Sequence, residues 1–321
     1  MIYNGLKDIA HKFDIFLFDA YGVFWEGNGF YAGSVEMMSQ LVLEGKQVVV
    51  VSNTAMCNAD TIASYERKGL LKGRDYTHFM TAGEVLHLEL MNKKIFVDKK
   101  KYYVLGFLRS KCFEGTQFQR VYNCDDADFI YCGVPFLTKE QISQFSKYND
   151  KFWPMKLDDS GEVCLWDSEI LLPYDEEIEK VAQTGLPIVN ANPDIFAREG
   201  HPLAENSEAV FVVRNGAFAE AFRNKGCEVI EYGKPHANIF EYVFDLLRKE
   251  DIRIDKSRIC MVGDTIKTDV LGALNVGITP VLCMGTGITA WQISKGKSLN
   301  ILYKEELDDI NKLIQIDSVG G

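Results

Sequence analysis

Two short apolar runs, each ending at an aspartate, constrain the fold of this chain most strongly. Ile15-Phe16-Leu17-Phe18 leads directly into Asp19, and Ile259-Cys260-Met261-Val262 leads into Gly263-Asp264. Uninterrupted apolar runs of this length are typical of strands buried on both faces of a parallel sheet. Ligands of open α/β sheets bind beyond the carboxyl ends of the strands. We therefore expect the two carboxylates to lie near each other at one edge of a sheet.

A repeated alternation of strand and helix patterns predicts the fold class. The alternation begins near the first residues and returns late in the chain, which favours an α/β fold with a parallel sheet flanked by helices. The expected strands lie at about 14–18, 47–52, 228–231, 258–262 and 279–284, and the expected helices at about 34–45, 58–68, 236–249 and 267–275.

Residues 100–230 have a different texture and predict an inserted α+β module. Aromatic-rich strands are expected at 102–105 and 129–132, separated by longer polar connections. Thr81-Ala82-Gly83-Glu84 and Thr138-Lys139-Glu140-Gln141 have the spacing of capping boxes, which open helices. We expect a first domain of residues 1–82 and 230–321, and an inserted domain of residues 83–229, with limits certain to about ten residues.

Composition narrows the class of partner and the compartment. The 321 residues carry a net charge of −11, so no basic surface favours nucleic acid or an anionic membrane. The eight cysteines are dispersed without a C-x-x-C pair, which indicates thiols in a reducing compartment. No signal-peptide pattern and no run of about 18 apolar residues is evident. We expect a cytoplasmic protein that binds neither nucleic acid nor membranes.

Further polar groups near the predicted strand ends suit phosphoryl chemistry. Ser52, Asn53 and Thr54 end a Val-rich strand, and their side chains and turn amides can hold phosphate oxygens. Lys234 stands between Gly233 and Pro235, just before a predicted helix. A carboxylate can attack phosphorus while Mg²⁺, which prefers one or two carboxylates, offsets the repulsion. Taken singly, each of these segments is equally well an ordinary turn or helix cap.

Together these segments resemble the four motifs of the haloacid dehalogenase (HAD) superfamily. The order and approximate spacing match, and the large insertion is similar to that of the NagD-like branch of phosphatases, whose fold is a Rossmann-like core with an inserted α/β cap. The resemblance spans about residues 12–285. It rests on Asp19-x-x-Gly22-Val23, Ser52-Asn53, Gly233-Lys234-Pro235 and Gly263-Asp264-x-x-x-Thr268-Asp269, with Thr81 to Glu84 and Asn190 to Asp194 resembling the cap entry and a cap loop over the site.

The resemblance implies a magnesium-dependent phosphomonoesterase of a small phosphorylated metabolite, working through an aspartyl-phosphate. Asp19 would be the nucleophile, and Mg²⁺ would be held by Asp19, Asp264 and the backbone carbonyl of Tyr21. Asp269 would orient Lys234 or a metal-bound water. The remaining implied roles are phosphate and substrate binding by Ser52, Asn53, Thr54, Lys234, Asn192, Pro193 and Asp194. Family analogy also suggests a homodimer.

Tyr21 departs from the family pattern. Phosphatases of this superfamily usually carry an aspartate there, acting as acid for the leaving oxygen and then as base for water. A tyrosine hydroxyl, with an ordinary pKa near 10, is a poor proton donor and acceptor at neutral pH. Phe18-Asp19-Ala20-Tyr21-Gly22 instead resembles the start of 2-haloacid dehalogenases. Two alternatives therefore stay open: dehalogenase-type hydrolysis, and a phosphate-binding or regulatory protein with little turnover.

Overall fold

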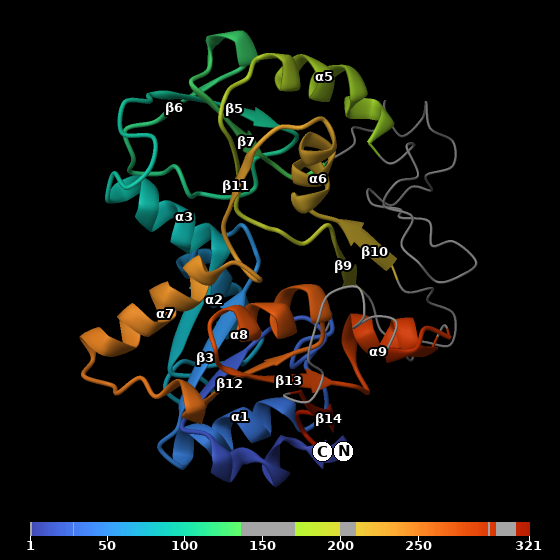
Figure 1. The fold of residues 1–321 in the computed structure, drawn as a ribbon. Coiled ribbons are helices and arrows are strands. Elements are labelled where there is room, and N and C mark those ends of the chain that lie inside the picture. Colours follow the sequence, from blue (N-terminus) through green and yellow to red (C-terminus); the bar gives the residue numbers. More distant parts are fainter. Residues whose placement is uncertain (1, 28, 136–170, 200–209, 295, 300–312) are drawn as a thin grey trace.

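Two parallel sheets form the framework of the protein (Figure 1). The computed structural model describes residues 2–27, 29–135, 171–199, 210–294, 296–299 and 313–321. Within these residues, the larger sheet has seven strands and the smaller has five, and we call them the core sheet and the cap sheet. In Figure 1 they make a lower and an upper lobe, and the two chain ends lie together in the lower lobe. The predicted α/β fold with a parallel core sheet is confirmed.

The strand order shows how the chain crosses between the lobes. The core sheet runs β1 (Ile2–Gly5), β14 (Ile314–Ser318), β13 (Thr279–Cys283), β12 (Ile259–Gly263), β2 (Ile15–Phe18), β3 (Gln47–Ser52) and β4 (His78–Thr81). The cap sheet runs β11 (Val229–Glu231), β8 (Ile188–Asn190), β7 (Phe129–Cys132), β5 (Lys101–Leu105) and β6 (Gln119–Val121). A separate antiparallel pair joins β9 (Phe196–Glu199) to β10 (Val210–Val213).

Helices cover both sheets. They are α1 (Ser34–Leu43), α2 (Asn58–Glu66), α3 (Ala82–Met91), α5 (Asp175–Gln183), α6 (Gly216–Asn224), α7 (Ala237–Lys249), α8 (Leu271–Asn275) and α9 (Gly287–Ser294). Short 3₁₀ turns occur at η1 (Leu6–Asp8), η2 (Ala10–Lys12), η3 (Cys124–Asp126), η4 (Leu172–Tyr174) and η5 (Lys256–Arg258).

Two expected elements differ in detail from the observed ones. The strand expected at 228–231 is present as β11, but it pairs with β8 in the cap sheet rather than resuming the core. Its short apolar pattern could not distinguish between two parallel sheets. The helix expected at 267–275 begins as a π-helical turn, η6 (Ile266–Val270), before α8. The capping box predicted at 138–141 lies outside the described residues.

The helix predicted after Thr81 begins at Ala82, but its cap uses a different partner from a standard capping box. The Thr81 hydroxyl accepts a hydrogen bond from the Glu84 N–H at 2.9 Å, as expected. The Glu84 carboxylate, however, accepts from the Asn58 N–H at 3.0 Å, and Thr81 N–H donates to the Asn58 side chain at 3.0 Å. The helix entry is thereby bonded to the start of α2.

One apolar cluster continues from the core sheet into the cap. The buried face of α7 carries apolar residues at helical spacing, among them Ile239, Phe240 and Val243, and α7 packs beside α3. These two helices bridge the lobes. The cluster includes Leu17 and Val49 of the core sheet, Leu86 of α3, Phe240 of α7, and Tyr102, Phe129 and Tyr131 of the cap sheet.

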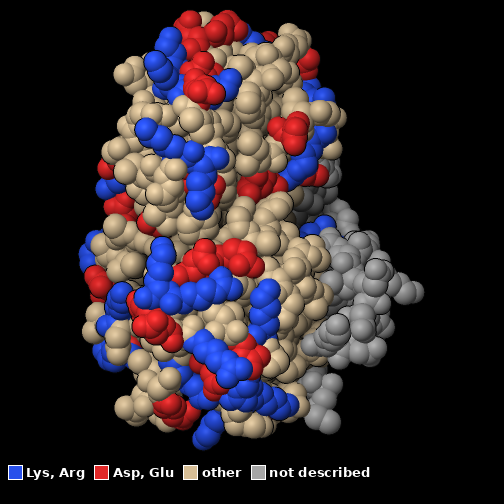
Figure 2. Space-filling model, turned by 60° about the vertical axis from the view of Figure 1, so that its left-hand side comes forward, with Lys and Arg blue, Asp and Glu red and all other residues tan. Residues whose placement is uncertain are grey.

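On the face shown in Figure 2, Lys and Arg side chains are interspersed with Asp and Glu. Among the residues that the structure describes, no helix is both long enough and apolar enough to cross a membrane.

Candidate active site

Neighbouring strands bring the predicted carboxylates to one edge of the core sheet. β2 and β12 pair in parallel with Phe18 opposite Val262, and the Asp19 N–H donates to the Val262 carbonyl at 2.9 Å. Asp264 follows the end of β12 by one residue. The expectation drawn from the two apolar runs therefore holds: Asp19 and Asp264 lie together.

Lys234 lies in the same cluster. Its ammonium is 2.7 Å from Asp19 Oδ1 and 2.8 Å from Asp269 Oδ1, and its side chain is 1% exposed. Although burial disfavours the charged amine, the carboxylates of Asp19 and Asp269 raise the pKa of Lys234 above its usual value. Lys234 is thus a fixed positive charge at the carboxyl end of β2.

Asp269 holds the turn that carries Asp264. Its Oδ2 accepts hydrogen bonds from the N–H groups of Asp264 at 3.1 Å and Thr265 at 3.0 Å. Since its Oδ1 faces Lys234, both oxygens are engaged, and Asp269 lies behind the cavity rather than in its wall. The geometry suits an orienting role more than a direct role with a ligand.

Within this cluster, Asp19 and Asp264 are the carboxylates that can hold a metal ion, and Asp269 lies beside them. Asp19, Asp264 and Asp269 each offer an oxygen, and these oxygens lie within 4.8 Å of one another. With Lys234 as the counter-charge, the cluster retains an excess of two negative charges when its carboxyls are ionised. Burial, with the neighbouring carboxylates, raises the pKa values of Asp19 and Asp264 above their ordinary range. An all-oxygen, negatively charged donor set of this kind fits Mg²⁺.

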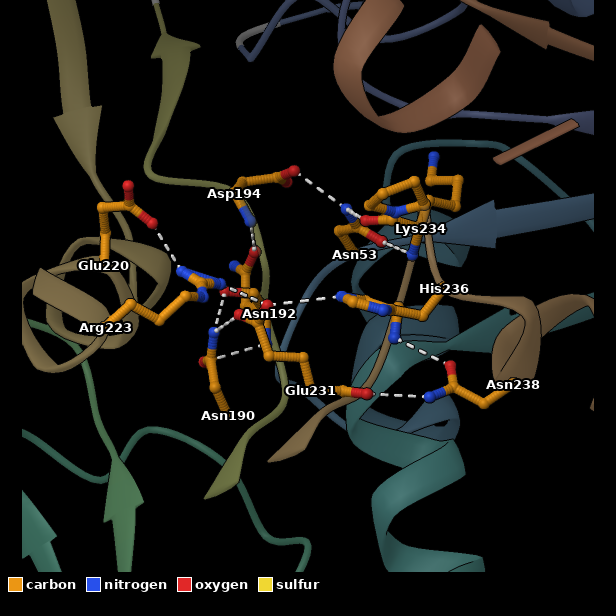
Figure 3. A network of polar contacts seen from close by, with 12 residues as sticks. Asn53, Asn190, Asn192, Asp194, Glu220, Arg223, Glu231, Lys234, His236 and Asn238 are labelled. Atoms are coloured by element: carbon orange, nitrogen blue, oxygen red, sulfur yellow. Dashed lines mark hydrogen bonds and ion pairs between the residues drawn. The ribbon is translucent and has the colours of Figure 1, made fainter. Parts of the chain in front are cut away.

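Asn53 joins the core sheet to the cap loop. Its Nδ2 donates to Asp194 Oδ1 at 2.8 Å and to the Lys234 carbonyl at 2.9 Å, while its Oδ1 accepts from the Lys234 N–H at 2.7 Å. Figure 3 shows Asn53 between Lys234 on one side and Asp194 on the other. Burial raises the pKa of Asp194 despite the hydrogen bond from Asn53.

All but one of the predicted site residues line one cavity of about 750 Å³ between the lobes. The exception is Asp269. Loops after the carboxyl ends of cap strands reach the same cavity: Arg109 after β5, Val134 after β7 and Asn192 after β8. The predicted residues in its wall are Asp19, Tyr21, Ser52, Asn53, Thr54, Asn192, Pro193, Asp194, Lys234 and Asp264.

Tyr21 is half-buried in the cavity wall. Its backbone forms a bridge with Trp25, which fixes the loop after Asp19. Trp25 itself is 2% exposed and packs against Phe30 and Tyr65, with ring centroids 5.1 and 5.7 Å away. Trp25 therefore belongs to the core and not to the cavity wall.

Sequence reasoning missed the segment Thr286 to Thr289. The Ile288 N–H donates to Asp264 Oδ2 at 2.6 Å, and the Thr286 hydroxyl donates to the Gly22 carbonyl at 2.6 Å. Gly287 has φ +77°, and a Cβ there would lie 2.1 Å from Asp264 Oδ2. A glycine-rich turn after the last predicted strand was the available signal, since it marks close backbone approach.

Sequence reasoning also missed the cationic side chains that the cap brings to the cavity. Arg109 and Arg214 line it from the cap, and Lys267 lines it from the core. Nothing in the sequence around either arginine distinguishes it from a surface residue.

Two family models and several known proteins are similar to this chain in sequence. Residues 16–112 match a family model described as haloacid dehalogenase-like hydrolase, and residues 231–297 match one described as HAD-hydrolase-like. Phosphoglycolate phosphatase 2 of Arabidopsis thaliana is 24% identical over 338 residues, covering 97% of this chain and 97% of that protein. Chronophin of Mus musculus is 24% identical over 293 residues, covering 89% of this chain and 85% of that protein.

Solved structures share the fold over nearly the whole chain. A haloacid dehalogenase-like hydrolase from Brucella suis 1330 has a TM-score of 0.72 at 20% identity, covering 99% of this chain and 100% of that one. NagD from E. coli K-12 has a TM-score of 0.56 at 17% identity, covering 96% of this chain and 98% of that one. At these identities the structural likeness concerns the fold and not the substrate.

Proposed function

This chain belongs to the haloacid dehalogenase superfamily, in its NagD-like phosphatase branch, and on that basis we propose that it is a magnesium-dependent phosphomonoesterase. The observation that carries the proposal is the convergence of Asp19, Lys234 and Asp264 in one cavity between the lobes. A nucleophilic carboxylate, a fixed cation and a further carboxylate are the groups that phosphoryl transfer through an aspartyl-phosphate needs.

In the proposed first step, a carboxylate oxygen of Asp19 bonds to phosphorus as the bond to the leaving oxygen breaks. Lys234 balances the charge of the transferring group, and Ser52 and Asn53 orient its oxygens. A water then attacks the phosphorus of the aspartyl-phosphate, releasing inorganic phosphate and restoring the carboxylate. Mg²⁺, held by Asp19, Asp264 and the Tyr21 carbonyl, would supply charge neutralisation for the attack.

Protonation of the leaving oxygen distinguishes this protein from the usual pattern of its family. Tyr21 is a weak acid, so we propose that the proton comes mainly from water. Turnover should then favour substrates whose leaving groups are already acidic, such as aryl or acyl phosphates.

The cap side of the cavity bears on the substrate. Arg109 makes no hydrogen bond or ion pair with any residue in the described part of the chain, and it lines the cavity together with Arg214. Two cationic side chains in the same cavity wall as Asn192, Pro193 and Asp194 favour a small metabolite with a second negative group over a neutral one.

The proposal also covers the domain limits, the compartment and the oligomeric state. We propose core limits of 1–82 and 230–321 and cap limits of 83–229, each to within about ten residues. The two sheets support this division, and the end of β11 at Glu231 in the cap sheet lies within that margin. The cysteines in the described part of the chain are free and mostly buried, which supports a reducing compartment such as the cytoplasm. A homodimer remains a proposal by family analogy.

Hydrolysis of p-nitrophenyl phosphate tests the function. We expect release of p-nitrophenol with Mg²⁺, none with chelator, and essentially none in Asp19→Asn, whose amide is isosteric but barely nucleophilic. Full activity in purified Asp19→Asn would contradict the mechanism. Halide release from 2-haloacids without phosphatase activity would instead favour dehalogenation. Binding of inorganic phosphate without turnover would favour a regulatory protein, the alternative to which Tyr21 points.

A further inference from the structure

Glu231 is a buried carboxylate at the end of the cap sheet that the proposed chemistry does not use. Its side chain is 5% exposed, and its Oε2 faces Arg223 and, at 3.3 Å, His236. Although burial opposes ionisation, hydrogen bonds from His236 and Asn190 and the charge of Arg223 hold the pKa of Glu231 below its usual value. Figure 3 shows Glu231 at the centre of a polar network between α6 and the start of α7.

From Glu231, hydrogen bonds can be followed along the cap loop. Asn190 Nδ2 donates to Glu231 Oε1 at 2.8 Å and to the Asn192 carbonyl at 2.9 Å. Asn190 Oδ1 accepts from the Asn192 N–H at 3.2 Å, and Asn192 Oδ1 accepts from the Asp194 N–H at 3.0 Å. The side-chain amides of Asn190, which is 0% exposed, and Asn192 thus hold the loop from 190 to 194 in its shape.

Through Asn53 of the core, the hydrogen-bonded path then reaches Lys234, three residues after Glu231. Asp194 Oδ1 accepts from Asn53, and Asn53 makes the two hydrogen bonds to the Lys234 backbone described above. The polypeptide segment from Glu231 to Lys234 joins the two ends of this path and closes a ring. We call this set the polar ring: Asn53, Asn190, Asn192, Asp194, Glu231 and Lys234.

We propose that Glu231 is a positioning residue for the phosphate site, acting through the polar ring. By holding Asn190, Glu231 fixes the cap loop against the segment 231–234, and this fixes Asn53 and the backbone of Lys234. The inference rests on the proposed function, because it explains how Asn53 and Lys234, which would hold the transferring phosphoryl group, are oriented. Outer partners of this kind matter because displacing a reacting group by about 1 Å can cost about 100-fold in rate.

The test compares Glu231→Ala, Asn190→Ala and the double variant with Glu220→Ala. Glu220 pairs with the same Arg223, at 2.6 Å, but lies outside the ring, which makes it a matched control. The readouts are kcat and KM for p-nitrophenyl phosphate with Mg²⁺, calorimetric affinity for inorganic phosphate, and melting temperature. All kinetics are measured well below the lowest melting temperature.

We expect each ring variant to lower kcat/KM by about 10–100-fold, the usual effect of removing an outer partner, with the control close to wild type. If the two residues act through one ring, the double variant should be no worse than the worse single variant. Multiplicative losses, or a folded Glu231→Ala with wild-type kcat/KM and phosphate affinity, would overturn the proposal.

Two further comparisons keep the test decisive. Asn190→Asp places two carboxylates, the new one at position 190 and that of Glu231, opposite each other. Adding Glu231→Gln to this variant restores an amide donor between the two positions. This double variant should therefore recover part of the kcat/KM that Asn190→Asp loses. Absence of any recovery would count against the ring, even where Glu231→Ala does not fold. A wild-type protein without turnover would refute the proposed function alone, since phosphate affinity in the variants still tests positioning.

Discussion

Replacing Lys234 by methionine should remove most of the activity together with a large part of the stability. The lysine is 1% exposed and lies 2.7 Å from Asp19 and 2.8 Å from Asp269. Methionine has a similar length but no charge, so the variant keeps most of the packing. Two carboxylates are then left in the site without their cation.

Both losses can be sized from general magnitudes. Removing one partner of a buried ion pair typically costs about 3–5 kcal/mol, because the remaining charge stays uncompensated. Removing one preorganised group that stabilises transition-state charge typically lowers kcat by about 10²–10³-fold, or about 2.7–4 kcal/mol. We expect Lys234→Met to fall within both ranges.

The control is Lys249→Met, at the exposed end of α7. Urea unfolding followed by circular dichroism gives the free energy of unfolding, and p-nitrophenyl phosphate kinetics with saturating Mg²⁺ give kcat. Kinetics are compared only where both variants are folded. Equal kcat values for the two variants would refute the assignment of Lys234, and equal unfolding free energies would refute its role as the counter-charge.

Three further predictions test other parts of the structure. Tyr21→Asp should accelerate alkyl phosphates by roughly 10²–10⁴-fold and flatten the plot of log kcat/KM against leaving-group pKa; a plot already flat in the wild type would mean that another group donates the proton. Gly287→Ala should raise the Mg²⁺ concentration needed for half-maximal activity, because its Cβ would lie 2.1 Å from Asp264, whereas Gly277→Ala, at a similar φ of +73° with no atom within 4 Å, should cost stability only. Burial raises the pKa of Asp75, but hydrogen bonds and the neighbouring arginine outweigh it, so the pKa of Asp75 in the folded protein is lowered. The stability that the ionised Asp75 contributes to the fold is therefore complete above the unfolded pKa of about 3.9. It is lost as the pH falls through the lower folded value. Asp75→Asn should therefore destabilise by about 2–3 kcal/mol at pH 7, and its deficit in urea unfolding should narrow below about pH 4; a constant deficit would contradict this.

The core of the site could be read from the sequence because its information is local. An apolar run followed by Asp19 or Asp264 specifies both a buried strand and the end at which its carboxylate emerges. Pairing of the two strands then brings the two carboxylates together, since Phe18 lies opposite Val262. The positions of these groups follow from the general geometry of parallel sheets.

The remainder depends on contacts that sequence spacing does not encode. Ile288 reaches Asp264 only because the turn after β13 folds back on it, and Asn53 reaches Asp194 across 141 residues. β11 was assigned to the wrong sheet for the same reason: three residues of strand pattern are compatible with either neighbour. The two arginines of the cavity wall gave no local signal at all.

The apolar cluster that bridges the lobes has a consequence for folding. Leu17 of the core sheet and Tyr131 of the cap sheet belong to one cluster, joined by α3 and α7. Separating the lobes would expose this shared interior, at a cost of about 25 cal/mol for each Å² of apolar surface. The protein should therefore melt in a single calorimetric transition. A cap exchanged between relatives would have to bring matching faces of both bridging helices with it.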